Sequence, residues 1–583
     1  CPEGGEHVRE RGQPLFGVFR VPERGGDGGV VLLRRPLERR DLLALLAALL
    51  LTGCQHAPTV PESPRNHGLC AGDGALDPSL HVVASDRRGR LLDVTYDAAR
   101  GRLVEGESLD DDATSKRLDE VVAHLRSAQK RVGNPEQSLD VVVFIHGGLN
   151  ALDNSLERAS IYVPAMCEEG KYPLFIVWPS EGFQTYADSI ANHYQGDWGH
   201  PGFAWTVPFK LATDAAEVVA RSLLNYAKQL NRWAGGSCYN ERLREFSRGW
   251  YCGRDGATDP YTDPCEEKDP VQGFSCSGGN RDAARDYAIS QARYAPAMPL
   301  KALTVPLVDP LGERAWLSME ARTRFVFRHP CRTDSGAAEG DCKPGIAAAL
   351  FEKLDNGRSL VDVSAKRRAE IAAESQGPGM RITLIGHSMG TMVAADIVRK
   401  FPRLPYDNVV FFGAAITVRE FRNSVEALLR ERVRDCGDRC PGALAPFHFY
   451  NVSLHPYAEA SEENGWGSLP SGSLLEWIDF VFRAPPELSE RTLGRWANVA
   501  AMRSTFDEQL LAEHMHFHRL GLCATDPRKH GDFICDKDEL GDPSTGRKPA
   551  PHCATPQFWR KEAWTRSTCP SKERLEGSLS STP

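Results

Sequence analysis

The 583-residue sequence has no excess of positive charge and no repeat of fixed period. Its net charge of −8 lacks the basic footprint that a nucleic-acid-binding protein would carry, so no nucleic-acid partner is expected. Without a repeat, a solenoid or propeller is not indicated. With 41% hydrophobic and 25% charged residues, the chain has the composition of a globular protein with a sizeable core. The length favours a core with a large insertion or a second domain.

A short apolar run near the start of the chain is typical of an export signal and too short for a membrane span. Residues 42–51 form this run, and the basic stretch 34–40 precedes it. The run ends in Leu51-Thr52-Gly53-Cys54, which resembles the lipobox of bacterial lipoproteins. That resemblance implies a lipid anchor on Cys54 and, because Gln55 follows, an outer-membrane location facing the periplasm.

The most informative segment is Arg381 to Gly390, where a β-favouring run leads into a Gly-x-Ser-x-Gly turn and then a helix-forming stretch. Gly386 and Gly390 flank Ser388 at the positions where side chains would collide as the chain reverses. The pattern predicts a nucleophile elbow that presents the Ser388 hydroxyl above a sheet.

A second apolar strand, residues 139–145, runs directly into a glycine-rich loop that begins at His146. Glycines there let backbone N–H groups approach a developing oxyanion, and one such donor contributes about 3 to 4 kcal/mol to transition-state stabilisation. We expect the donors to be the N–H of Met389 and that of Gly148 or Leu149. We expect His146 to orient the loop by hydrogen bonding.

Three blocks of sequence, taken in order, resemble the alpha/beta-hydrolase superfamily, with closest similarity to poorly characterised bacterial members. They are His-Gly-Gly-Leu-Asn at 146–150, Trp-Pro-Ser at 178–180 and His-Ser-Met-Gly at 387–390. The resemblance covers the half of the core from the oxyanion strand to the nucleophile. It implies an α/β fold, mostly a parallel sheet flanked by helices, and an esterase-like or lipase-like enzyme without a cofactor. The triad would follow the chain order serine, acid, histidine.

The acid is therefore sought downstream of Ser388. The strand expected at 408–416 ends without a carboxylate, so the acid is assigned to the loop after the next strand, 447–454. Glu459 is nearest the strand end and is the first choice, with Glu462 and Glu463 as alternatives.

The base is assigned to His530, in the His-Gly-Asp-Phe sequence after the last expected strand, with His455 as the competing histidine. That last strand carries His514, His516 and His518 on one face by its period of two. No cysteine or carboxylate at metal-ligand spacing accompanies them, so we interpret them as a sheet face and expect no metal.

Cysteine usage independently supports an exported protein. Without Cys1 and Cys54, the 16 cysteines leave 14, an even number that permits seven disulfides in an oxidising compartment. Close spacing predicts four of them: Cys331 with Cys342, Cys436 with Cys440, Cys523 with Cys535, and Cys553 with Cys569. A bridge between Cys523 and Cys535 would stiffen the loop that carries His530.

These segments define the expected domain organisation. It comprises a non-native upstream extension (1–33), a lipoprotein signal peptide (34–53), a flexible tether (54–75), a first core part (76–184), a disulfide-rich insertion or lid over the active site (185–380) and a second core part (381–575). The favoured function is a membrane-anchored serine hydrolase acting on carboxylic esters, including lipids. The alternatives are an amidase or peptidase using the same triad, and a non-catalytic envelope binding protein on a hydrolase scaffold. The sequence does not indicate an oligomeric state.

Overall fold

The computed structural model describes residues 68–180, 272–276, 316–327, 344–355, 379–436, 445–462, 473–521 and 523–565, apart from short gaps within these ranges. The chain divides into two units, Cys1–Thr59 and Val60–Pro583, and every described residue belongs to the second. The signal segment and Cys54 lie outside the described residues. So do Leu149 and Glu463.

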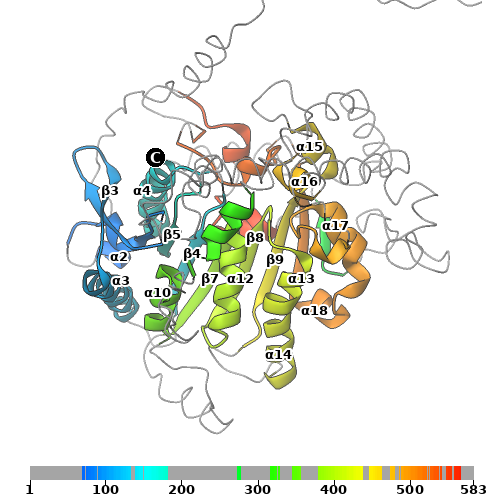
Figure 1. The fold of residues 1–583 in the computed structure, drawn as a ribbon, viewed down its shortest axis with the longest axis horizontal. Coiled ribbons are helices and arrows are strands. Elements are labelled where there is room, and N and C mark those ends of the chain that lie inside the picture. Colours follow the sequence, from blue (N-terminus) through cyan, green and yellow to red (C-terminus); the bar gives the residue numbers. More distant parts are fainter. Residues whose placement is uncertain are drawn as a thin grey trace, which may run out of the picture. The chain divides into compact units, whose positions relative to one another are not determined.

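An eight-stranded parallel sheet forms the centre of the second unit (Figure 1). Its order is β1-β5-β4-β7-β8-β9-β10-β6, and all seven neighbouring pairs are parallel. The strands are β1 (Val82–Ala84), β4 (Leu139–Ile145), β5 (Tyr172–Val177), β6 (Phe274–Cys276), β7 (Met380–His387), β8 (Tyr406–Phe412), β9 (His448–Leu454) and β10 (Met515–Leu520). This confirms the predicted α/β class with a mostly parallel sheet.

The central strands read as continuous apolar runs because helices bury both faces of such a sheet. All six residues of β5 are buried, as are six of the seven in β4 and in β8. A separate antiparallel hairpin pairs β2 (Leu92–Asp97) with β3 (Arg102–Ser108). Its contacts with α4 extend the core beyond the β1 edge.

The helices that pack on the sheet have apolar faces toward it and capped or charged ends. The N-terminus of α3 (Asp111–Arg131) is capped by the Asp110 side chain, which accepts the Ala113 N–H at 2.8 Å. In Figure 1, α12 crosses in front of the central strands, and it contacts β7 and β4. The longer helices are α3, α4 (Leu152–Glu168), α10 (Ile346–Leu354), α12 (Gly390–Lys400) and α14 (Ala427–Cys436). The shorter ones are α2 (Gly68–Ala71), α13 (Val418–Phe421), α15 (Pro456–Ser461), α16 (Leu474–Trp477), α17 (Trp496–Met502), α18 (Glu508–Glu513) and α19 (Lys561–Thr565).

Parts of the range 185–380 belong to the main core. The strand β6 extends the sheet by pairing with β10, and α10 packs on α3 and α12. Phe274 and Phe351 are buried in the main apolar cluster. Residues expected in a lid over the active site therefore also complete the sheet edge and the helical layer.

The structure contains a disulfide between Cys70 and Cys167 and another between Cys535 and Cys553. The second contradicts two predicted pairs, because Cys535 was assigned to Cys523, and Cys553 to Cys569. Spacing along the chain misled the prediction, since η12 (Pro551–Ala554) folds back beside η11 (His530–Phe533). Cys523 is disulfide-bonded to a cysteine other than Cys535. The predicted pairs Cys331–Cys342 and Cys436–Cys440 involve residues outside the described ranges.

Among the described helices, none has both the length and the apolar character that a bilayer-spanning helix requires.

Candidate active site

Ser388 occupies a strained turn between β7 and α12. Its φ of +49° makes it the one described residue other than glycine in the left-handed region, a conformation that costs on the order of 1–3 kcal/mol and needs support from its surroundings. That support comes from the chain after β8. The Ser388 N–H donates to the Phe412 carbonyl at 2.9 Å, and the Ala415 N–H donates to the Ser388 carbonyl at 3.1 Å. Backbone hydrogen bonds to both the N–H and the carbonyl of Ser388 thus hold the residue in this conformation.

The loop after β4 and this turn lie so close together that the glycines between them could not carry a side chain. A Cβ placed on Gly147 would lie 2.8 Å from the Ser388 Cβ. A Cβ placed on Gly390 would lie 2.2 Å from the Ile145 carbonyl oxygen. The glycines on both segments therefore allow the loop after β4 and the serine to lie together.

Two backbone N–H groups at this junction have the properties of oxyanion donors. Gly148 lies beside Met389, since a Cβ on Gly148 would be 2.5 Å from the Met389 Sδ. In the described part of the chain, neither the Gly148 N–H nor the Met389 N–H donates to an acceptor. Both remain available to a developing negative charge.

His146 uses both ring nitrogens within the loop. Its Nδ1 donates to the Gly147 carbonyl at 2.7 Å, and its Nε2 accepts the Trp178 N–H at 2.9 Å. The ring also stacks on Trp178, with centroids 4.1 Å apart. Since burial lowers the pKa of His146 to about 3, the neutral ring orients the loop, the role expected of it.

His530 lies at the start of η11, on the carboxyl-end side of the sheet with Ser388. Its carbonyl accepts a hydrogen bond from the His387 Nε2 at 3.1 Å, and the two rings stack with centroids 5.2 Å apart. A Cβ on Gly413 would lie 2.8 Å from the His530 Nδ1, so the ring sits directly over the turn that follows β8. The sequence did not reveal the contribution of His387, which connects the turn at Ser388 to His530.

The electrostatic state of His530 suits a general base. Burial lowers its pKa to about 4, so the imidazole is neutral at pH 7. Its Nε2 and the Ser388 Oγ are both buried, and each lacks a hydrogen-bond partner among the described residues. The competing histidine, His455, follows β9, and its N–H donates to the Leu520 carbonyl at 2.6 Å.

The two described candidate acids have different contacts. Glu459, on α15, is 2% exposed; its Oε2 lies 3.6 Å from the Arg495 Nε, and its Oε1 accepts from the Ser473 hydroxyl at 3.5 Å. The Glu462 Oε2 accepts the His530 backbone N–H at 3.0 Å. Burial raises the pKa of Glu459 to about 8 and that of Glu462 to about 7. Within the described ranges, no carboxylate is bonded to the His530 ring.

The first choice, Glu459, thus belongs to an ionic cluster around Arg495. The guanidinium also lies 3.5 Å from an Asp479 oxygen and 3.7 Å from a Glu476 oxygen. The alternative, Glu462, is the acid that the structure brings to the histidine residue itself.

A small apolar cluster, separate from the main core, surrounds Met389, the residue after Ser388. It consists of Trp316, Met319, Met389, Ala415, Leu475 and Ile478. The Met319 Sδ would be 3.7 Å from a Cβ on Gly148, so the helical segment 316–324 reaches the loop after β4. The Trp316 Nε1 is buried without a hydrogen-bond partner among the described residues. Sequence reasoning missed this segment because no motif marks it.

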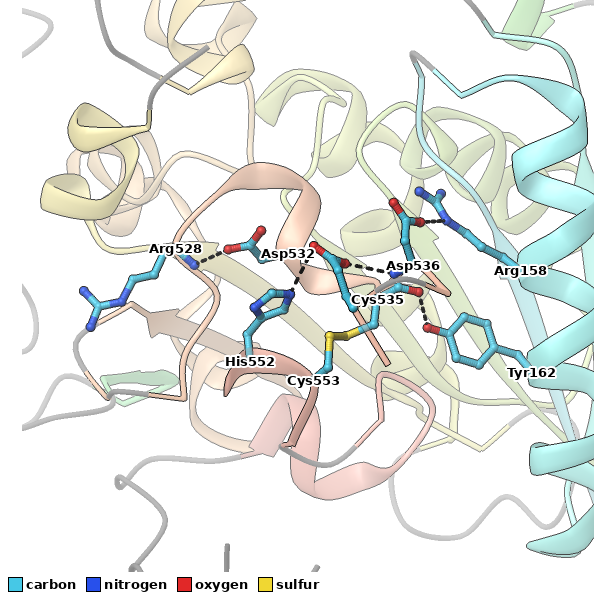
Figure 2. The surroundings of a disulfide bond; sticks show 9 residues. Arg158, Tyr162, Arg528, Asp532, Cys535, Asp536, His552 and Cys553 are labelled. Carbon is cyan, nitrogen blue, oxygen red and sulfur yellow. Dashed lines mark hydrogen bonds and ion pairs between the residues drawn. A yellow bond between two sulfur atoms is a disulfide. The ribbon is translucent and has the colours of Figure 1, made fainter. Parts of the chain in front are cut away.

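The chain that follows His530 is anchored from two directions (Figure 2). The Cys535–Cys553 disulfide ties it to η12 (Pro551–Ala554). On the other side, Tyr162 of α4 donates its hydroxyl hydrogen to the Cys535 carbonyl, and Arg158 pairs with Asp536. A cavity of about 30 Å³ lies beside the disulfide, lined in part by Phe533 and His552.

In the described part of the chain, two groups bring at least three metal-type ligand atoms within 4.8 Å of one another. They are Cys535, Glu539, His552 and Cys553, and Cys70, His81 and Cys167. In each group the two sulfur atoms are joined in a disulfide, so neither offers thiolate ligands in this state.

Comparisons with models of protein families, with curated proteins and with solved structures gave no match to this chain. The functional argument therefore rests on the geometry of the described residues.

Proposed function

We propose that the chain is a serine hydrolase of the alpha/beta-hydrolase type, which cleaves carboxylic esters through an acyl-enzyme on Ser388. The observation that carries the proposal is the strained serine after a central parallel strand, with an unbonded hydroxyl and two unbonded N–H groups beside it. The nucleophile, the candidate acids and the histidine follow the carboxyl ends of β7, β9 and β10. Sites on open parallel sheets form at that edge, and the chain order agrees with a Ser–acid–His triad.

The reaction follows from the state of each group. The neutral His530 would accept the Ser388 proton as the hydroxyl oxygen attacks the ester carbonyl carbon. The N–H groups of Gly148 and Met389 would stabilise the oxyanion, and the protonated His530 would give its proton to the leaving alkoxide. Water, activated by the same imidazole, would then hydrolyse the acyl-enzyme and release the carboxylic acid.

We assign the orienting carboxylate to Glu462. It accepts the His530 backbone N–H at 3.0 Å, so its carboxylate lies beside the residue that it would orient. The Glu459 carboxyl instead contacts Arg495 and Ser473, so we assign it a structural role. A carboxylate on the ring would hold the required tautomer and stabilise the imidazolium that forms.

The side chains around the elbow favour an ester with an apolar acyl group. Trp316, Met319 and Met389 present no charge beside the oxyanion donors, and an apolar acyl chain would replace their mutual contacts with contacts to substrate. Lipidation of Cys54 and an outer-membrane location stay part of the proposal, on the sequence resemblance alone.

A specific observation favours the rival function, a non-catalytic binding protein on the same scaffold. Ser388 is 2% exposed and Trp316 is fully buried, so the serine hydroxyl is closed off in this conformation. Catalysis requires that the residues covering Ser388 move enough to admit an ester, whereas a binding protein has no such requirement.

The deciding experiment uses the Cys54→Ser chain, a fluorophosphonate probe and p-nitrophenyl esters from acetate to palmitate. Ser388→Ala should abolish labelling and turnover, and His530→Ala should lower turnover by several orders of magnitude. His455→Ala, the matched control, should leave turnover near that of the parent chain. A parent chain that neither labels nor hydrolyses any of these esters would establish the binding scaffold instead.

A further inference from the structure

A cluster of histidines lies at the amino ends of the sheet strands, opposite to the carboxyl ends where Ser388 lies. His448 begins β9, His514 directly precedes β10, and His516 is the second residue of β10. The parallel register pairs His516 with Tyr450, and the Phe449 N–H donates to the His514 carbonyl at 2.8 Å. Because side chains alternate along a strand, the three histidines share one face at the amino ends of the two strands.

Two of these imidazoles are already spaced as ligands of one ion. The His448 Nδ1 and the His516 Nε2 are 3.2 Å apart and share an N–H···N hydrogen bond, which a bound ion would replace. Two nitrogens bound tetrahedrally to one Zn²⁺, each at its usual bond length, are about 3.3 Å apart. The His514 ring centroid lies 5.5 Å from that of His448, and its Nε2 lies 3.8 Å from a Glu513 carboxylate oxygen, so His514 would have to rotate to bring a third imidazole nitrogen to the same point.

The three side chains are only half-buried, so an ion can reach them. The Lys561 ammonium nearby opposes a cation, and the Asp407 carboxylate favours one.

The neighbouring His518 is excluded from the set. It is hydrogen-bonded to Ser275 of β6 and is 8% exposed. The ligand set therefore differs from the run of alternate histidines in the sequence, because it takes His448 from the adjacent strand in place of His518.

We propose that His448, His514 and His516 form a binding site for a borderline divalent metal ion, Zn²⁺ in the first instance, with water in the remaining position. Imidazole nitrogens suit Zn²⁺, Cu²⁺ and Ni²⁺ and do not suit Mg²⁺ or Ca²⁺. This revises the interpretation of the histidines as a plain sheet face. The site is separate from Ser388 and does not depend on the hydrolase proposal.

The test is a calorimetric titration of the chelator-treated, disulfide-intact Cys54→Ser chain with Zn²⁺, alongside thermal unfolding with and without the ion. We expect one equivalent to bind and the melting temperature to rise. His516→Ala and His448→Gln should each weaken binding by more than about 100-fold, beyond the usual effect of an outer-shell change. His518→Ala is the matched control and should bind like the parent chain.

The unfolding curves without metal show whether each variant is folded, so a loss of binding cannot be mistaken for a loss of structure. Absence of binding in the parent chain would overturn the proposal, as would Zn²⁺ affinity that His516→Ala leaves unchanged. Equal losses in His518→Ala and His516→Ala would also overturn this ligand set.

Discussion

At the scale of single residues, Glu459 and Glu462 differ in what their carboxylates contact. Only Glu462 contacts the His530 residue, through its backbone N–H. We expect Glu462→Gln to lower kcat for ester hydrolysis by on the order of 10³-fold or more, because the histidine would lose the group that orients it and stabilises its charge. Glu459→Gln should retain most of the activity. Steady-state kinetics on one p-nitrophenyl ester compares them, and the reverse order of losses would return the acid to Glu459.

The buried carboxyl of Glu459 also predicts a pH dependence of stability. Burial raises its pKa from 4.5 to about 8 in the folded chain. Folding therefore favours the protonated form, and this contribution to stability is full below pH 4.5 and is lost as the pH rises toward 8. Relative to the parent chain, Glu459→Gln should become progressively more stable from pH 5 to pH 8, by at most about 1.4 kcal/mol per pH unit.

Urea unfolding at three pH values measures this difference. Glu513→Gln is the control, because the Glu513 side chain is 58% exposed. A stability difference between Glu459→Gln and the parent chain that stays constant with pH would show that the carboxyl titrates normally.

At the scale of elements, the junction of β4, β7 and α12 depends on glycine. A Cβ on Gly390 would be 2.2 Å from the Ile145 carbonyl oxygen and 2.6 Å from that of His146, and a backbone atom cannot move aside cheaply. We expect Gly390→Ala to lower the free energy of unfolding by roughly 1 to 3 kcal/mol and to reduce ester hydrolysis. Gly531→Ala is the control, since a Cβ there meets no atom within 4 Å. Equal stability of the two variants in urea would contradict the close approach.

The same elements show what a sequence can predict. The strands β4 and β7 coincide with the runs predicted at 139–145 and after Arg381, because a strand buried on both faces is mostly apolar. The turn at Ser388 was predictable because few residues other than glycine fit beside it. The pairing of β6 with β10 was not, since it joins segments about 240 residues apart and depends on no local pattern.

The choice of acid could not be made from sequence for a related reason. Glu459, Glu462 and Glu463 share their chemistry and nearly share their position in the chain. What separates the first two is contact with Arg495 in one case and with His530 in the other. Those partners come from other elements, so only the folded arrangement distinguishes them.

At the scale of the whole molecule, the two described disulfides constrain the chain over very different lengths. Cys70 and Cys167 are 97 residues apart, whereas Cys535 and Cys553 are 18 apart. They also lie at opposite ends of the sheet strands. Cys167 precedes β5 and therefore lies near the amino ends of the strands, whereas Cys535 follows His530 on the side of Ser388.

Removing either disulfide should therefore affect stability and activity to different extents. In the chain-entropy account, a loop of about 100 residues contributes close to 4.7 kcal/mol and one of about 15 residues close to 3 kcal/mol. We expect the double variant Cys70→Ser with Cys167→Ser to be less stable in urea than the double variant Cys535→Ser with Cys553→Ser. The second variant should lose more kcat, because it frees the loop that carries His530, while the first should keep kcat at temperatures where it stays folded. A kcat unaffected in the second variant would mean that Tyr162 and Arg158 hold the loop without the disulfide.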